Sequence, residues 1–125
     1  MRDLSRIEVL AIAKDLAEHS YRFSKRLPPQ ERYGMISQIT RSSVSIAANI
    51  AEGFGRGTEG DLERHLRIAL GSAAELSILI ELAERVHGIE YPEREHLAER
   101  LDAVRRKLNR LTTKVTQSRR IAKSE

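Results

Sequence analysis

The 125-residue chain contains no cysteine and no tryptophan, and only 4% of its residues are aromatic. Without cysteine there can be no disulfide bond, no thiolate metal site and no cysteine nucleophile. With few aromatic rings there are few platforms on which nucleic-acid bases could stack. No apolar stretch approaches the roughly 18 residues that a membrane-spanning helix needs. Charges interrupt the apolar stretches near the N-terminus, a pattern unlike a signal peptide. We therefore expect a cytoplasmic protein without a membrane partner.

Acidic residues are scarce at the C-terminal end of the chain. Residues 104–125 contain eight Lys and Arg but one acid, whereas the other 103 residues contain 14 basic and 17 acidic side chains. This asymmetry indicates an anionic partner, RNA or DNA. The alternative is that these cations complement the helix dipole and keep the protein soluble. The candidate nucleic-acid-binding residues are Arg105, Arg106, Lys107, Arg110, Lys114, Arg119 and Arg120.

Glycine and proline are also few, and they divide the chain into four segments. Within each segment the apolar residues recur at helical spacing, and strand-like alternation is nowhere sustained. The predicted helices cover residues 4–25, 30–54, 58–87 and 92–117, with residues 118–125 as a frayed tail. Short connections between long helices favour antiparallel neighbours. We predict one all-α domain over residues 1–125, an antiparallel up-down-up-down four-helix bundle.

Several residues predict where these helices end. Gly53, Gly55 and Gly57 are expected to end the second helix. Thr58, followed three residues later by Asp61, predicts the N-terminal cap of the third helix, and Gly88 is expected to end that helix. The fourth helix has the clearest apolar stripe, with spacings that alternate between four and three residues. The stripe consists of Leu97, Leu101, Val104, Leu108, Leu111 and Val115.

The third helix has a second apolar stripe, on the side away from its predicted core face. It consists of Gly71, Ala74, Ile78 and Leu82. An exposed patch of this kind usually marks an interface, so these residues are candidates for a contact between copies of the chain. The alternative is a small patch covered by long neighbouring side chains.

A polar stripe on the second helix lies opposite its isoleucines, and two polar residues of the third helix could meet it. The stripe and its partners are Gln38, Arg41, Ser45, Asn49, Glu52, Arg56, Ser72 and Glu75. Their donors and acceptors balance, which permits a buried network or a binding cleft. An ordinary solvated face is the alternative. Our hypothesis is a structural network, largely shielded from water, that includes Arg41, Asn49, Glu52, Arg56 and Glu75.

The sequence offers little for catalysis. The four histidines are scattered, with no H-x-x-x-H pair to hold a metal, and we interpret them as surface groups. The stretch "GFGRG" follows no strand and lacks the Walker lysine, so it does not predict a phosphate-binding loop. Ser43 and Ser45 have no evident base beside them. We expect a protein that is not an enzyme and needs no cofactor or metal.

Two blocks, "QITRSSVSIAANIAEGFGRG" and "LRIALGSAAEL", resemble the bacterial 23S ribosomal RNA intervening-sequence protein family. The resemblance rests on an R-x-x-x-S-I-x-x-N-I-A-E-G-x-x-R pattern from Arg41 to Arg56 and an A-x-G-S-x-x-E pattern from Ala69 to Glu75. It implies a four-helix bundle that assembles into rings of five. A related branch is the basic accessory variability protein of diversity-generating retroelements, which works with a reverse transcriptase and nucleic acid. The expected function is that of a ring-forming nucleic-acid binder. The alternative is a scaffold or adaptor for a protein partner.

Overall fold

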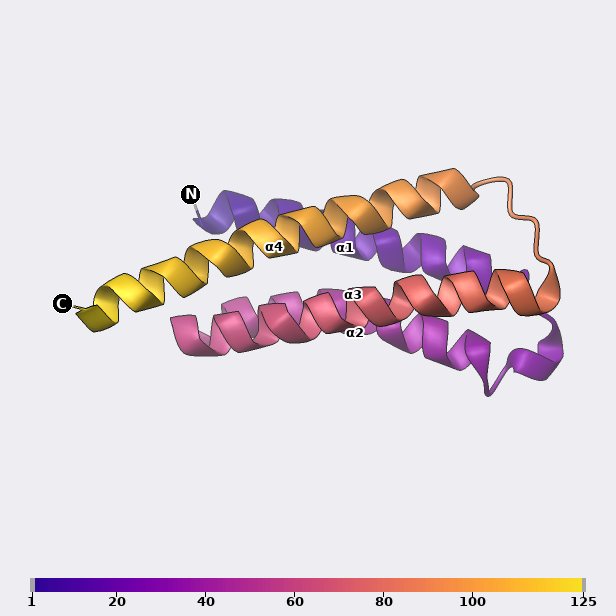
Figure 1. Cartoon of the computed structure of the whole chain (residues 1–125), viewed down its shortest axis with the longest axis horizontal. Helices are drawn as coiled ribbons and strands as arrows, with labels where there is room; N and C mark the ends of the chain where they lie inside the picture. The colour runs from indigo at the N-terminus through magenta and orange to yellow at the C-terminus, as the bar shows by residue number, and fades with distance from the viewer. Residues whose placement is uncertain (1, 125) are drawn as a thin grey trace.

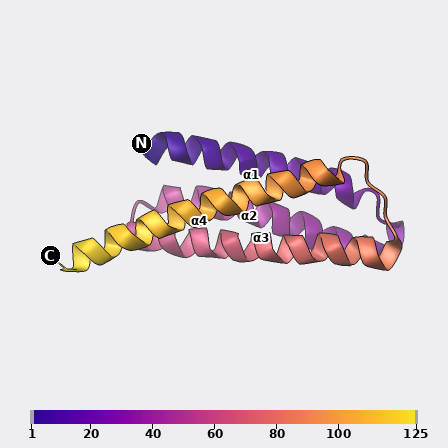
Figure 2. The same ribbon diagram turned by 45° about the horizontal axis from the view of Figure 1, so that its top comes forward.

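The computed structural model describes residues 2–124, which form four long helices and one short 3-10 helix (Figure 1). The elements are α1 (Arg2–Ser24), η1 (Pro29–Glu31), α2 (Met35–Arg56), α3 (Glu59–His87) and α4 (Arg94–Ser124). Consecutive helices run in opposite directions, and both α1 and α3 pack against α2 and α4 (Figures 1 and 2). No strand occurs among the described residues. The predicted all-α, antiparallel four-helix bundle is therefore confirmed.

The second predicted helix begins later than expected, because the chain between Pro28 and Gly34 forms η1 and a turn. Gly34 precedes α2 with φ −109° and ψ −111°, which is not helical. The Glu31 carboxylate accepts the backbone N–H of Met35 at 3.2 Å, so it satisfies a donor that the start of a helix leaves free. The helix predicted from residue 30 thus starts at Met35.

The three glycines at the end of α2 have different roles, contrary to the prediction that all three end the helix. Only Gly57 has a left-handed backbone, with φ 85°, and α2 ends one residue before it. Gly53 lies inside the helix and is buried. A Cβ atom at residue 53 would lie 2.9 Å from the Cβ of His65 on α3. Gly53 is therefore a point of close contact between α2 and α3.

The ends of α3 follow the predicted signals. Thr58 Oγ1 accepts the N–H of Asp61 at 3.2 Å, and the Asp61 carboxylate accepts the Thr58 hydroxyl at 3.0 Å. At the other end Gly88 takes a left-handed φ of 60°, and its N–H donates to the Glu84 carbonyl at 2.8 Å. The capping assignment made from the sequence is correct at this helix because both signals are local.

The fourth helix starts two residues after Pro92 and continues to Ser124, whereas the sequence predicted an end at residue 117. The continuation remains attached to α3. Thr116 and Arg119 both donate to the Glu63 carboxylate, and Ser118 Oγ donates to Glu59 at 3.3 Å. Beyond these contacts, the C-terminal end of α4 extends past the connection between α2 and α3 (Figures 1 and 2).

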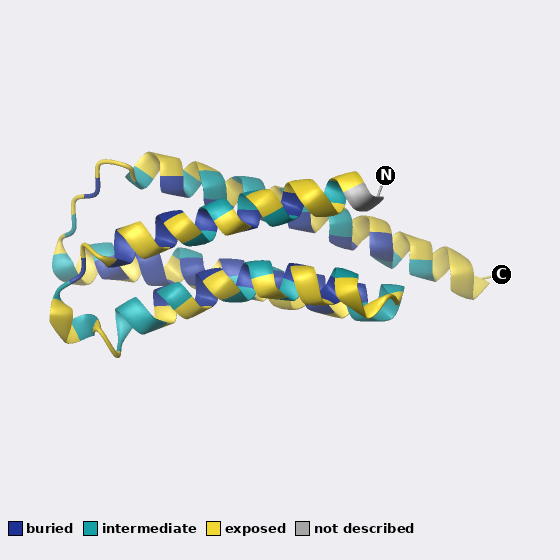
Figure 3. Cartoon of the chain, turned by 180° about the vertical axis from the view of Figure 1, so that it is seen from behind, coloured by how far each residue is buried: buried dark blue, intermediate teal, exposed yellow. Residues whose placement is uncertain are grey.

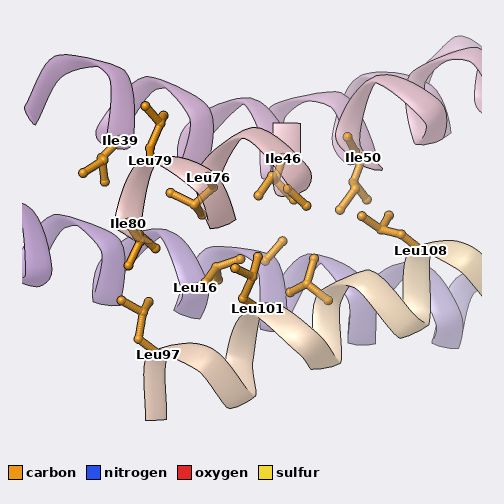
Figure 4. Close-up of a cluster of buried hydrophobic side chains, with 14 of the residues drawn as sticks. Leu16, Ile39, Ile46, Ile50, Leu76, Leu79, Ile80, Leu97, Leu101 and Leu108 are labelled. Carbon is orange, nitrogen blue, oxygen red and sulfur yellow. The ribbon is translucent and has the colours of Figure 1, made fainter. Parts of the chain in front are cut away.

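Buried and exposed residues alternate along each helix (Figure 3), and aliphatic side chains from all four helices fill the centre of the bundle (Figure 4). Side chains with no exposed surface include Leu16, Ile46, Leu76, Leu97 and Leu108. Complete burial of one such side chain contributes about 1.5–3 kcal/mol to folding. Of the predicted stripe on the fourth helix, five residues are buried and Leu111 is partly buried against them. This core fixes which faces of the helices remain for other contacts.

Candidate functional site

Polar side chains meet along the contact between α2 and α3. We call this set the polar seam; it contains Ser42, Ser45 and Asn49 of α2 and His65, Ser72 and Glu75 of α3. Ser42 Oγ donates to Glu75 Oε1 at 2.5 Å, and the hydroxyls of Ser45 and Ser72 lie 2.8 Å apart. Asn49 Nδ2 donates to Ser45 Oγ at 3.1 Å and to the Ser45 carbonyl at 2.9 Å. The seam therefore bonds α2 to α3 over several turns.

The hydrogen bonds of the seam also orient the ring of His65. Because the Asn49 amide nitrogen donates to Ser45, its oxygen is the atom that faces His65 Nδ1, at 3.0 Å. His65 Nδ1 must then carry a proton. Its Nε2 lies 3.1 Å from a guanidinium nitrogen of Arg64, which can only donate. His65 therefore donates from Nδ1 to the Asn49 amide oxygen, and its Nε2 faces the Arg64 guanidinium.

His65 corrects the interpretation of the histidines as surface groups, because only 6% of its surface is exposed. His19 is buried too, at 7%. A signal for His65 was present in the sequence. His65 precedes Ser72 by seven residues, or about two helical turns, so the two side chains share one face of α3. The prediction does not include His65, because it pairs the polar stripe only with Ser72 and Glu75.

The predicted polar stripe divides into two parts in the structure. Ser45, Asn49 and Ser72 lie in the seam, and Glu75 joins it through Ser42, which the sequence interpretation did not include. The stripe residues on the outer side of the seam are exposed; these are Gln38, Arg41, Glu52 and Arg56. Glu52 and Arg56 form an ion pair at 2.9 Å, with 51% of each side chain exposed. The single chain thus leaves this part of the stripe open to water, together with Glu75, although the hypothesis expected it to be shielded.

This division predicts different losses of stability for two alanine variants of α2. Asn49→Ala leaves His65 without its acceptor at a buried position, so we expect a loss of about 1–3 kcal/mol. Glu52→Ala removes only an exposed ion pair, so we expect a loss of about 0–1 kcal/mol. Both substitutions place Ala in α2, so they can be compared directly. The measurement is the free energy of unfolding in urea. A larger loss for Glu52→Ala would contradict the assignment of stability to the seam.

The predicted nucleic-acid-binding residues lie on different sides of α4. Lys107 pairs with Glu8 of α1 at 2.5 Å, and Arg119 pairs with Glu63 of α3. These two cations therefore hold helices together, and Arg105 is half-buried. The four exposed members of the set, which we call the basic face, are Arg106, Arg110, Lys114 and Arg120.

Glu63 is the centre of an ionic cluster between α3 and α4. Only 11% of its side chain is exposed. Its carboxylate accepts from Thr116, from Arg67 at 3.0 Å and from Arg119. The hydroxyl of Thr116, followed by the guanidinium groups of Arg67 and Arg119, lowers the pKa of Glu63 from 4.5 to about 2. The charged carboxylate thereby holds Arg67 at the boundary between the two helices.

Two exposed faces of the bundle carry apolar residues of different size. On α3, the predicted interface residues Gly71, Ala74, Ile78 and Leu82 are all exposed, the last two by 55% and 44%. Ile68 and Val86 extend this face along the helix, with exposed fractions of 40% and 65%. On α2, a row of small exposed residues runs beside the exposed polar stripe, namely Val44, Ala48, Ala51 and Gly55. The apolar side chains of the α3 face are therefore large, and those of the α2 face are small.

Within residues 2–124, no three His, Asp or Glu side chains gather as they would around a metal ion. None of the helices described there is both long and apolar enough to span a membrane.

The fold and the seam place the chain in the class of small helical bundles held by an aliphatic core and a polar contact between two central helices. The family model for the 23S rRNA-intervening sequence protein matches residues 5–110. The chain belongs to this family. A solved structure from Bacteroides thetaiotaomicron, described as a protein with unknown function from the S23 ribosomal protein family, is similar to it. That similarity covers 87% of this chain and 98% of the other, at 25% identity and a TM-score of 0.77. Among curated proteins, none matches this chain.

Proposed function

We propose that this chain is a non-enzymatic bundle that assembles into a ring in the cytoplasm and binds RNA through the basic face of α4. The observation that carries the proposal is the exposure of Arg106, Arg110, Lys114 and Arg120 on one long helix. Cations in this arrangement suit contact with a phosphate backbone, which needs charge rather than sequence reading. The family name, which refers to an intervening sequence of 23S rRNA, agrees with a role near RNA.

Support for a ring comes from the two apolar faces. The bulky face of α3 and the small face of α2 differ, so a contact between them joins unlike surfaces of two copies. A contact of this type closes into a ring when the rotation between copies permits it. Five copies is the number that the family resemblance implies. In such a ring the basic face would be repeated once per copy, which would strengthen the attraction for a polyanion.

The salt dependence of RNA binding tests this function. We expect the affinity of the wild-type protein for a labelled single-stranded RNA to fall steeply as salt rises from about 50 to about 200 mM. Replacing the four basic-face residues with Gln should weaken binding and flatten the slope of log K against log salt by up to roughly 3. Lys107 is left unchanged because it pairs with Glu8.

A control variant carries the same change of charge elsewhere. Lys14, Arg22, Lys25 and Arg85 are exposed on α1, the turn that follows it and α3, and their replacement by Gln also removes four positive charges. We expect this variant to keep nearly the wild-type slope. Equal slopes for the two variants would mean that net charge, not the basic face, drives binding. A wild-type protein without measurable RNA affinity would overturn the proposed function.

A scaffold for a protein partner is the second candidate function. It is favoured by the exposed half of the polar stripe, where Gln38 and Arg41 share one side of α2 with the ion pair of Glu52 and Arg56. Mixed polar groups on one helix face can recognise another protein surface. This candidate predicts normal assembly, no salt-dependent RNA affinity, and co-purification of a protein partner that survives nuclease treatment.

A further inference from the structure

A polar groove lies between α3 and the C-terminal half of α4, on the side of α4 that faces α3. It has a volume of about 300 Å³. Leu70 and the buried Thr112 form part of its lining. The other lining residues are Arg67, Asn109, Thr113, Thr116, Gln117 and Arg120. Only Arg120 is shared with the basic face.

The groove has a positive charge and many hydrogen-bonding groups. Two arginines line it, whereas none of its lining residues is acidic. The carboxylate that contacts the lining residues is that of Glu63. It already accepts hydrogen bonds from Thr116, Arg67 and Arg119. Because its pKa is lowered to about 2, Glu63 stays charged at neutral pH and keeps Arg67 in place through one guanidinium nitrogen. The same nitrogen also donates to Thr116 Oγ1 at 3.2 Å, so the Nε and Nη1 donors of Arg67 are the ones available for a ligand.

The neutral polar groups in the groove make it different from a simple phosphate site. Asn109, Thr113 and Gln117 are exposed, and each can both donate and accept hydrogen bonds. A ribose hydroxyl also donates and accepts, so it can pair with an amide or a hydroxyl in either direction. The two arginines supply the charge that a phosphate requires. The volume of the groove is at the lower end of the range for small-molecule sites.

From this combination we infer that the groove between α3 and α4 binds one ribose-phosphate unit, with Arg67 and Arg120 on the phosphate and Asn109 and Gln117 on the ribose. The unit can come from a strand of RNA or from a free ribonucleotide, since both present the same chemistry. In the case of a strand, the inference rests on the proposed function and adds a preference for RNA over DNA. Deoxyribose lacks the 2′-hydroxyl that the amides would contact.

The test is a double variant, Asn109→Ala with Gln117→Ala, which changes no charge. Its binding to a short oligouridylate is compared with binding to the matching deoxyoligonucleotide over a range of salt. We expect the wild type to prefer the RNA, and the double variant to bind the RNA roughly three- to tenfold more weakly, with little change for the DNA. The slope of log K against log salt should stay unchanged. Gln30→Ala with Gln38→Ala, which removes two exposed amides elsewhere, is the control.

A second measurement separates the two sources of the ligand. Uridine 5′-monophosphate is added to the wild-type protein, and the amide resonances of residues 109–120 are followed by NMR. Shifts confined to the groove, absent in the double variant, support a free nucleotide as ligand. Shifts with the oligouridylate alone support the strand.

The remaining outcomes overturn the inference. If the double variant binds RNA like the wild type and the basic-face variant does not, the groove assignment is wrong and the proposed function stands. If the wild-type protein binds neither oligouridylate nor uridine 5′-monophosphate, both the groove assignment and the proposed function are wrong.

Discussion

Replacing Ile78 with Asp should convert the assembled protein into single chains of 14.2 kDa. Ile78 is 55% exposed in the single chain and lies in the middle of the bulky face of α3. If that face meets the small face of α2 on the next copy, the Asp carboxylate would be buried without a partner. Such burial costs several kcal/mol, more than a contact of this kind can offset. Light scattering of the wild type should give about five times the single-chain mass.

Ile121→Asp is the matched control for this variant. Ile121 is 61% exposed, lies near the end of α4 and belongs to neither apolar face. We expect this variant to keep the wild-type mass, and circular dichroism should show that both variants remain helical. A wild-type protein that scatters as a single chain would exclude assembly. A wild-type assembly that Ile78→Asp leaves intact would place the contact on another face.

Gly53→Ala should destabilise the bundle, although Ala is the better helix former. Alanine in place of glycine within a helix stabilises the protein by about 0.5–1 kcal/mol. At this position, however, the added Cβ would lie 2.9 Å from the Cβ of His65 and 3.2 Å from Leu62 Cδ1. The His65 atom is bound directly to the α3 backbone, so it cannot move away without shifting the helix. Overpacking of this kind costs about 1–3 kcal/mol, so we expect a net loss of stability.

Gly71→Ala provides the opposite expectation with the same chemical change. A Cβ at residue 71 would meet nothing within 4 Å in the single chain, so only the gain in helix propensity remains. Both glycine variants are best made in the Ile78→Asp background, because residue 71 also lies on the bulky face. The free energy of unfolding in urea should then be lower for Gly53→Ala than for its parent, and higher for Gly71→Ala. A stabilised Gly53→Ala would mean that α2 and α3 are not in close contact at this point.

The two glycines show why the candidate site could be predicted only in part. Both lie within helices and neither has a left-handed backbone, so no local signal in the sequence separates them. The difference is the distance to a neighbouring helix. The same holds for Lys107 and Arg119, which look like their exposed neighbours in sequence but pair with Glu8 and Glu63. The partners of these two cations lie 99 and 56 residues away along the chain.

Local patterns sufficed for the helical class, the number of long helices and the cap at Thr58, because apolar periodicity and capping act within a few turns. They also sufficed to place Ile78 and Leu82 on the outer side of α3, since a helix fixes the direction of each side chain. Packing between helices determined the features that local patterns do not predict. It buried His65 in the seam and extended α4 to Ser124 through the contacts with Glu63. It also created the groove between α3 and α4. The physical reason is that burial and ion pairing depend on which helices become neighbours, and a helix pattern read along one segment contains no information about its neighbour.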